Sequence, residues 1–250
     1  MARGVALALN HGIQPRCRLS IERVPLSGVE QCRSAMRSIL LVVAAALARA
    51  DDRPDVGDHA AFARYMVNRL TWATLSTISE DKEIKGYPFG NPVSIGDNAT
   101  GTPYMCVSPL DASVIDLEKN ARMSLTFSEA QEFVTTAACD PAGGDPENPP
   151  CSRLVLTGEF KKVDPKHEEW AVAAAALKSK HPAMDGWGCF GGGAMSSHAF
   201  FLAKLEIRQA WLINMYGGPA VVSPKDYYAA DAPLPAKSAA TGRAEATATA

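Results

Sequence analysis

The chain has 250 residues and a formal net charge of −2 at neutral pH. Seven of its 25 basic residues and two of its 27 acidic residues lie before Asp51, so residues 51–250 carry a net charge of −7. An acidic chain without a basic stripe has little electrostatic attraction for phosphate backbones, which argues against nucleic-acid binding.

The segment 36–50 has the form of a secretory signal peptide. Arg37 supplies a positive start, an apolar run follows over residues 39–48, and alanines stand at positions −3 and −1 of a cleavage site between Ala50 and Asp51. The apolar run is much shorter than the roughly 20 residues that a membrane-spanning helix needs. The sequence therefore predicts signal cleavage after Ala50, a secreted or lumenal protein, and no membrane span.

The residues in front of this segment have two interpretations. Met36 is a suitable initiator, so residues 1–35 are interpreted as a gene-model extension. The alternative is a longer targeting presequence, because residues 1–50 contain seven arginines, no lysine and two acidic residues, which is the bias of an organelle transit peptide. That alternative predicts an organelle protein, for instance one that handles haem or responds to stress.

A linker over residues 51–58 is expected to lead into the ordered region. Asp58 is the predicted N-cap of a helix over residues 59–69, which has an apolar stripe. Alternating β-branched residues predict a strand over residues 72–79, and a charged loop should follow over residues 80–89.

Two further strands are predicted over residues 92–96 and 102–107, joined by a polar turn. The turn contains Asn98-Ala99-Thr100, the one N-x-S/T triplet of the chain whose middle residue is not proline. Polar hairpin tips of secreted proteins are suitable acceptors for N-glycans. The sequence therefore predicts a glycan on Asn98.

The second half of the ordered region adds strands and helices without a repeating unit. A helix is predicted over 110–120, capped at Ser108-Pro109, and strands are predicted over 122–127 and 153–163. A helix over 164–180 and a glycine-rich surface loop over 186–195 should follow. The last predicted elements are one long strand or two end to end over 200–213, a short strand over 220–222, a helix that starts at Ser223-Pro224, and a disordered tail over 231–250. Strands with interspersed helices and no βαβ regularity predict an α+β fold, an antiparallel β-barrel with flanking helices.

Four cysteines follow residue 50. Cys139 and Cys151 bracket a loop of turn-forming residues, so a disulfide between them is predicted in an oxidising compartment. Cys106 is expected as a buried thiol in a strand, and pairing with Cys189 is the alternative. No CxxC motif and no Cys/His spacing of the zinc-site kind occurs, so no metal site is predicted.

Several blocks of the chain, taken in order, resemble one known family. They are 64–65 (RY), 72–79 (WATLSTIS), 86–89 (GYPF), 103–104 (PY), 108–110 (SPL), 145–151 (DPENPPC), 181–187 (HPAMDGW) and 216–228 (YGGPAVVSPKDYY). They resemble the CREG family, secreted glycoproteins with a flavin split-barrel fold. The resemblance extends over roughly residues 60–228 and implies a CREG-like domain over residues 59–230.

CREG-like proteins share the split barrel of the pyridoxamine 5′-phosphate oxidases, in which two subunits form a pocket for flavin mononucleotide (FMN). The resemblance therefore implies a homodimer. In the oxidases, a Ser-Arg-Lys sequence at the start of a helix holds the flavin phosphate, and the same places in this chain are Asp111, Ala112 and Ser113. Losing two cations and gaining an aspartate weakens phosphate binding, so no cofactor is expected.

Two functions are compatible with these patterns. The first is a secreted or endolysosomal homodimeric glycoprotein that binds a protein partner or receptor and has no catalytic residues. The alternative is an FMN-dependent oxidoreductase of the oxidase-like superfamily. The residues expected near FMN would then be Ser108, Asp111, Ala112, Ser113 and Arg122, with Lys119 and Arg153 as further sources of positive charge.

Overall fold

The computed structural model describes residues 53–132, 139, 145–191 and 198–231. The extension over 1–35, the signal peptide over 36–50, and the cleavage site at Ala50 and Asp51 lie outside the described residues. Apart from its first residue, the predicted tail lies outside them too.

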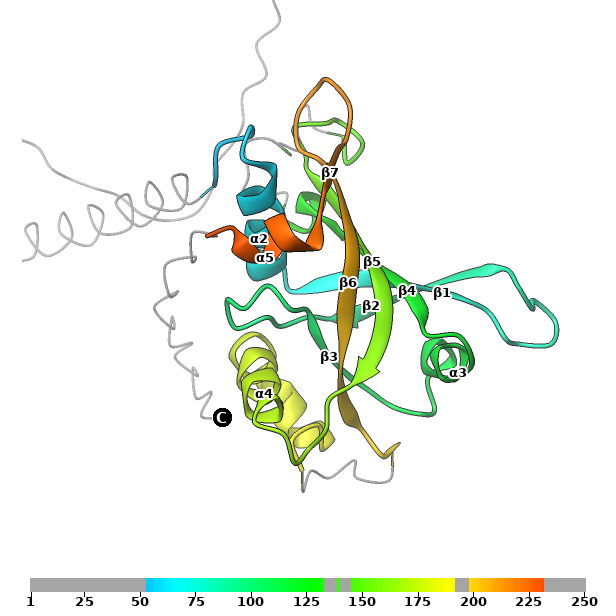
Figure 1. Ribbon diagram of the computed structural model, residues 1–250. Helices are drawn as coiled ribbons and strands as arrows, with labels where there is room; N and C mark the ends of the chain where they lie inside the picture. Colours follow the sequence, from blue (N-terminus) through cyan, green and yellow to red (C-terminus); the bar gives the residue numbers. More distant parts are fainter. Residues whose placement is uncertain (1–52, 133–138, 140–144, 192–197, 232–250) are drawn as a thin grey trace, which may run out of the picture. The chain divides into compact units, whose positions relative to one another are not determined.

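The described residues form one antiparallel sheet with helices around it (Figure 1). The sheet order is β2-β1-β4-β5-β6-β3, and β7 pairs with β6. The strands are β1 (Trp72–Ile78), β2 (Pro88–Ser94), β3 (Tyr104–Val107), β4 (Arg122–Ser128), β5 (Arg153–Lys162), β6 (Phe201–Ile213) and β7 (Ala220–Val222). Every pair is antiparallel, so the predicted α+β class and antiparallel architecture are confirmed.

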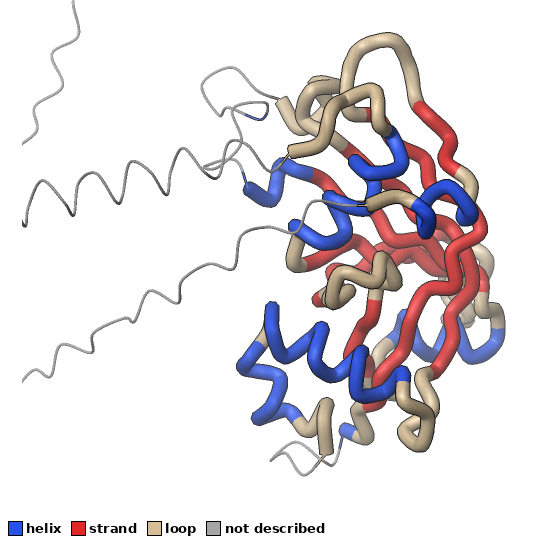
Figure 2. Tube along the Cα trace, turned by 60° about the vertical axis from the view of Figure 1, so that its left-hand side comes forward, coloured by secondary structure: helices blue, strands red, loops and turns tan. Residues whose placement is uncertain are grey.

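The sheet curls so that its two ends meet. The strands bend around the core in Figure 2, and an antiparallel bridge between Gly96 and Tyr104 joins the segment after β2 to β3. The single long strand β6 pairs with β5 along nearly its whole length, and it also pairs with β3 near its start and with β7 near its end. A sheet that closes in this way leaves few exposed strand edges.

In the described ranges, four α-helices and two short 3-10 helices accompany the sheet. They are α2 (His59–Arg69), α3 (Ala112–Lys119), α4 (Glu169–Lys180), α5 (Pro224–Ala229), η1 (Glu129–Glu132) and η3 (Pro182–Trp187). The predicted cap of α2 is present, because the Asp58 side chain accepts a hydrogen bond from the Ala61 N–H at 3.0 Å. Ser223 caps α5 in the same manner through the N–H of Asp226.

Three predicted boundaries are corrected by the structure. Helix α4 begins at Glu169 because residues 164–167 form a turn closed by the His167 N–H on the Asp164 carbonyl. Strand β2 begins at Pro88, inside the predicted loop, and pairs with β1 over its whole length. It is the outermost strand beside β1, where a proline without an N–H is tolerated.

The third correction concerns α3, which begins at Ala112 rather than at Leu110. Its N-cap is Asp111 and not Ser108. The Ser108 hydroxyl donates to the His198 carbonyl oxygen at 2.6 Å and accepts from the Leu110 N–H, so Ser108 stabilises a turn before the helix.

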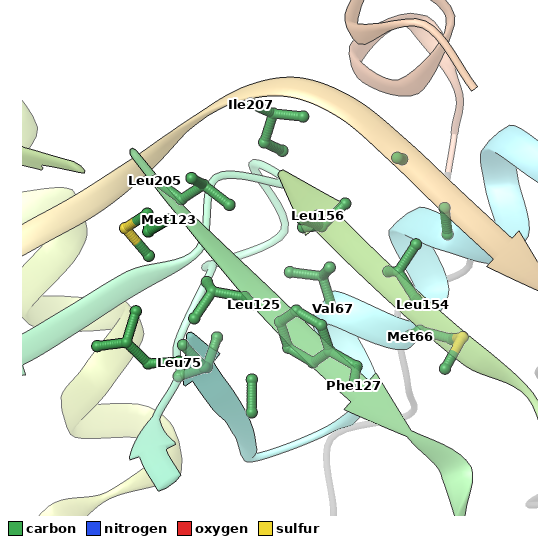
Figure 3. Packing of buried hydrophobic residues seen from close by; sticks show 14 of the residues in the cluster. Met66, Val67, Leu75, Met123, Leu125, Phe127, Leu154, Leu156, Leu205 and Ile207 are labelled. Atoms are coloured by element: carbon green, nitrogen blue, oxygen red, sulfur yellow. The ribbon is translucent and has the colours of Figure 1, made fainter. Parts of the chain in front are cut away.

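The main core lies between the inner face of the sheet and helix α2 (Figure 3). Side chains that alternate along each strand point inward, as the period of two requires. They include Leu75, Met123, Leu125, Phe127, Leu154, Leu156, Leu205 and Ile207, with Met66 and Val67 from α2. Burying each side chain of this size stabilises the fold by about 1.5–3 kcal/mol, so this cluster holds the barrel together. A second cluster packs α4 and η3 against β3.

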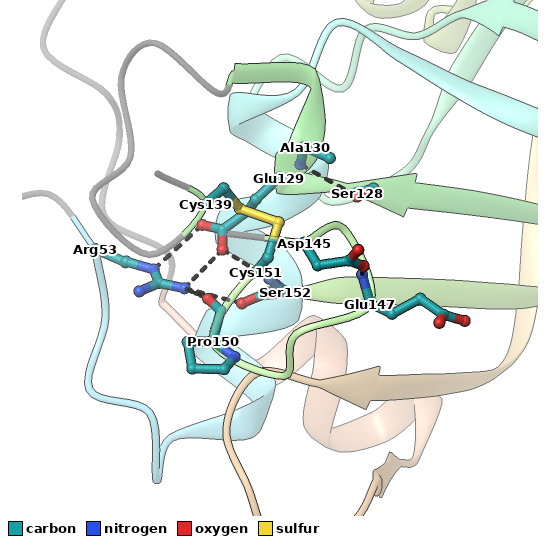
Figure 4. Close-up of a disulfide and its surroundings, with 10 residues drawn as sticks. All are labelled: Arg53, Ser128, Glu129, Ala130, Cys139, Asp145, Glu147, Pro150, Cys151 and Ser152. Carbon is teal, nitrogen blue, oxygen red and sulfur yellow. Dashed lines mark hydrogen bonds and ion pairs between the residues drawn. A yellow bond between two sulfur atoms is a disulfide. The ribbon is translucent and has the colours of Figure 1, made fainter. Parts of the chain in front are cut away.

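Arg53, shortly before α2, is held against the barrel by its side chain. The Arg53 guanidinium donates to both carboxylate oxygens of Glu129, at 3.2 and 2.6 Å, and to the Ser152 hydroxyl at 2.9 Å (Figure 4). The Glu129 side chain is only 3% exposed, so Arg53 neutralises a buried charge. Next to this network the predicted disulfide joins Cys139 to Cys151.

Candidate functional site

The N-terminus of α3 is the place where the family resemblance would put a flavin phosphate. A helix N-terminus attracts anions because its first N–H groups have no partner inside the helix. Here the Asp111 carboxylate accepts from the Ser113 N–H at 2.7 Å, and the Asp111 carbonyl accepts from the Val114 and Ile115 N–H groups at 3.0 Å. The protein's own acidic side chain therefore accepts a hydrogen bond from one of the N–H groups at this helix N-terminus.

The other residues of this segment do not supply a replacement for the missing cations. Ala112 is exposed and has no polar side-chain atom. The Ser113 hydroxyl is fully buried and, among the described residues, has no hydrogen-bond partner. Ser108 is buried and already bonded to His198. The four positions are adjacent, as the sequence requires, but they do not form a cationic phosphate cradle.

The basic residues considered for this site lie elsewhere. Arg122 follows the opposite end of α3, about 12 Å of helix away, and its exposed side chain donates to the Asn120 side chain at 3.1 Å. Lys119 is in the last turn of α3. Arg153 lies on β5, opposite Ser128 of β4. Lys119 and Arg122 therefore lie toward the C-terminal end of α3, and Arg153 lies on a strand of the sheet.

A polar cluster that sequence reasoning missed joins β3, α4 and β6. The Tyr104 hydroxyl donates to the Glu169 carboxylate at 3.1 Å, and the Lys204 ammonium contacts both oxygens of that carboxylate at 2.6 and 2.7 Å. Burial, followed by the Glu169 charge, raises the pKa of Tyr104 to about 12. The three residues are far apart in the chain, so no local pattern could reveal the cluster. Its members satisfy one another, which is the role of a structural link.

The predicted glycosylation turn is exposed at Asn98 and anchored behind it. Asn98 and Ala99 have φ values of 47° and 61°, in the left-handed region. The buried Arg64 donates to the Ala99 carbonyl oxygen at 2.7 Å and also to carbonyl oxygens at the end of α5. The Tyr227 hydroxyl donates to the Gly101 carbonyl oxygen at 2.7 Å. The turn therefore presents the Asn98 side chain to solvent in a fixed position.

The expectation of a free thiol at Cys106 is wrong, because Cys106 and Cys189 form a disulfide. The Cα atoms are 5.9 Å apart, within the range that a disulfide requires. The bond ties β3 to the segment after η3, which includes the first half of the glycine-rich loop. Residues 192–195 of that loop lie outside the described residues.

Histidine and acidic side chains are not gathered into a reactive centre in the described ranges. The His181 ring bonds to the Ile95 carbonyl at 3.1 Å, and the His198 Nδ1 has no partner there. No group of three or more His, Cys, Asp or Glu side chains in this part of the chain could hold a metal ion. Nor does the same part contain a helix of the length and apolarity that crossing a bilayer requires.

Comparison with known proteins agrees with this architecture. A solved structure described as a heme binding protein from Mycobacterium smegmatis has a TM-score of 0.54 and 23% sequence identity. The match covers 72% of this chain and 62% of that chain. At this identity the likeness concerns the fold alone.

Sequence comparison identifies closer relatives. Protein CREG1 of Mus musculus is 38% identical over 170 residues, which are 66% of this chain and 71% of that protein. Protein CREG2 of Homo sapiens is 38% identical over 176 residues, which are 68% of this chain and 56% of that protein. The family model described as "CREG, beta-barrel" matches residues 54–229, nearly all of the region described above. The chain therefore belongs to the CREG family.

Proposed function

We propose that this CREG-family chain is a secreted or endolysosomal glycoprotein that works as a homodimer by binding a protein partner, without catalysis and without a bound flavin. Two disulfides support a compartment outside the reducing cytosol. The exposed and anchored turn at Asn98 supports N-glycosylation there. The relatives named above support membership of the CREG family, and they do not identify the partner.

The observation that carries the proposal is the Asp111 carboxylate at the N-terminus of α3. A flavin phosphate bears about −1.5 to −2 charges. Two unit charges of the same sign about 4 Å apart repel by about 4 kcal/mol at an effective dielectric constant of about 20. That energy corresponds to about three orders of magnitude in Kd, and in the described ranges the Asp111 side chain accepts from the Asn91 amide and the Ser113 N–H rather than from a cation.

Flavin binding tests the proposal directly. The full chain, expressed and processed through a eukaryotic secretory pathway, would be purified without added flavin, and its absorption between 300 and 500 nm recorded. We expect a flat spectrum and no quenching of FMN fluorescence on titration. The double variant Asp111→Ser/Ala112→Arg, which removes the acid and adds one cation, should bind FMN at least tenfold more tightly than the wild type.

Ser113 is left unchanged in this variant because its side chain is fully buried and a lysine there would disrupt the core. A matched control is Ala175→Arg, which adds the same cation at an exposed position of α4 and should not alter FMN binding. A flavin band that persists in the wild type through dialysis would overturn the proposal and favour the FMN-dependent oxidoreductase.

A further inference from the structure

Arg64 is a buried cation whose hydrogen-bond partners are all uncharged. It lies on α2 and is 8% exposed. Its guanidinium donates to the carbonyl oxygens of Ala99 at 2.7 Å and Ala230 at 3.1 Å. Two longer contacts reach the carbonyl oxygens of Tyr227 and Tyr228, at 3.5 and 3.4 Å. Among the described residues it forms no ion pair, and its Nε is buried without an acceptor.

These contacts leave the positive charge of Arg64 without a counter-ion in the part of the chain that the structure describes. A buried charge is unfavourable unless an opposite charge accompanies it. The carbonyl oxygens at the end of a helix carry only a partial negative charge, so they offset only part of it. Asp97, in the turn at Asn98, is 1% exposed, and its carboxylate approaches Lys180 at 3.7 Å rather than Arg64. An anion that reached the guanidinium would therefore stabilise the fold.

Ala230, at the end of α5, is bonded to the fold through both of its backbone groups. Its N–H donates to the Asp226 carbonyl oxygen at 3.1 Å, and its own carbonyl accepts from Arg64. Helix α5 lies beside α2, which carries Arg64 (Figure 1). The family model matches up to residue 229, and residues 231–250 contain no aromatic residue and one large aliphatic residue, Leu234. Residues beyond Ala230 therefore offer little to a hydrophobic core.

The peptide bond between Ala230 and Asp231 could supply the missing anion if it were hydrolysed. Asp231 is exposed, and the backbone of Ala230 is extended, with φ −75° and ψ 138°. Exposed segments near chain ends are preferred sites of proteolysis. Water adds to the Ala230 carbonyl carbon and the C–N bond breaks, so that Ala230 gains a carboxylate and Asp231 an amino group. One oxygen of that carboxylate is the atom that already accepts from Arg64 at 3.1 Å.

We propose that a protease of the secretory or endolysosomal route cleaves after Ala230, and that Arg64 binds the new α-carboxylate. The cleavage rests on the compartment proposed above, whereas binding of the carboxylate requires neither that compartment nor a dimer or partner. Hydrogen bonds between ionised groups are about twice as strong as those between neutral groups. An α-carboxyl group has a pKa of about 3.3–3.7, and a neighbouring cation favours its charged form, so the pair persists at mildly acidic pH.

The C-terminus of the protein made in cultured eukaryotic cells tests the cleavage. The full chain would be expressed without a C-terminal tag, recovered from cells and from medium, and its C-terminal peptide identified by mass spectrometry. We expect the mature chain to end at Ala230. In the control Asp231→Pro the bond precedes a proline, which most proteases do not cleave, and the extended backbone of Ala230 accommodates it. A wild-type chain that keeps residues 231–250 in both fractions would overturn the cleavage.

Thermal unfolding before and after cleavage in vitro tests the role of Arg64. The full chain, secreted in the presence of protease inhibitors, would be cut before Asp231 by an endoproteinase that cleaves on the amino side of aspartate, and its mass checked. We expect the cut to raise Tm by about 3–6 °C. The control Asp231→Ala/Pro233→Asp moves the cut to follow Ala232, up to about 7 Å of chain further on, and should change Tm by less than about 1 °C.

Arg64→Gln removes the charge and keeps an amide donor, so cleavage before Asp231 should leave its Tm unchanged. An equal gain at both cut positions, or a gain that persists in Arg64→Gln, would mean that losing the tail stabilises the fold without a carboxylate at Arg64. No gain in the wild type would overturn the role of Arg64 as well. If circular dichroism shows Arg64→Gln to be unfolded, the shifted cut decides. Neither flavin nor a partner enters these measurements, so their failure is distinct from failure of the proposed function.

Discussion

Single side chains satisfy backbone groups at several places in this barrel. Asp111 closes the N-terminus of α3 with its own carboxylate, and Ser108 is held by the His198 carbonyl. Arg64 satisfies backbone carbonyl groups, because its guanidinium joins the turn at Asn98 to the end of α5. In each case a polar group of the chain satisfies a backbone group that would otherwise bind water or a ligand.

The buried Tyr104 predicts a pH dependence of stability at the alkaline end. Its pKa is raised to about 12 from 10.0, so above pH 10 the folded protein keeps a proton that the unfolded chain loses. The contribution of Tyr104 is therefore fully present below pH 10 and is lost as the pH rises to about 12. We expect Tyr104→Phe to lose less stability than the wild type across this window.

Urea denaturation of both proteins at about pH 9 and about pH 11.5 measures the difference. Tyr87→Phe is the matched control, because the Tyr87 side chain is 66% exposed. Between the two pH values, Tyr87→Phe should lose as much free energy of unfolding as the wild type. If Tyr104→Phe also followed the wild type, the raised pKa of Tyr104 would not be supported.

Elements of this fold are positioned by their ends as much as by their apolar faces. Helix α3 has eight residues, which is too short to be stable alone, and its N-terminus depends on Asp111. Helix α5 has six residues and is held by the Ser223 cap, the buried Tyr227 and Arg64. Short helices of this kind need both a cap and a tertiary contact.

The α3 cap therefore predicts a stability effect. Asp111→Ala removes the acceptor of the Ser113 N–H and should lower the free energy of unfolding by about 1 kcal/mol. Asp111→Asn keeps a capping oxygen and should cost less. Urea denaturation at one fixed protein concentration compares the two, because the proposed dimerisation would make stability depend on concentration. Equal losses in both variants would show that the cap is not the source of the effect.

Two disulfides cross-link the part of the chain that the structure describes. Cys139–Cys151 closes a loop beside the Arg53–Glu129 ion pair, whereas Cys106–Cys189 ties β3 to the segment that leads into β6. The sequence separations are 12 and 83 residues. A cross-link restricts the unfolded chain more strongly when the loop it closes is longer.

Removing each disulfide as a pair of alanines tests this account. The loss of Cys139–Cys151 should cost about 3 kcal/mol and the loss of Cys106–Cys189 about 4–5 kcal/mol, from the loop-closure entropy. Thermal and urea unfolding of the two double variants, at one protein concentration, shows which disulfide contributes more to the free energy of unfolding. A smaller loss for the Cys106–Cys189 pair would mean that loop length does not govern the stabilisation.

Local signals in the sequence predicted most of the fold but only part of the site. The cap at Asp58, the strand alternation around Leu75 and the turn at Gly217 each act within a few residues, so their elements were found close to their true positions. The start of α3 was misplaced because Ser108 and Asp111 are both good caps, and the choice depends on His198, which lies far along the chain.

The amino-acid sequence by itself determined the antiparallel α+β architecture, the Cys139–Cys151 disulfide and the family, because alternation, turn residues and ordered motifs are local properties of a chain. Only the tertiary structure decided the Cys106–Cys189 pairing, the Tyr104–Glu169–Lys204 cluster and the bonds from Arg64 to the turn at Asn98 and the end of α5. Each of these brings together residues from separate elements. Their contacts depend on strand register and on how the sheet closes, and no short stretch of sequence specifies either.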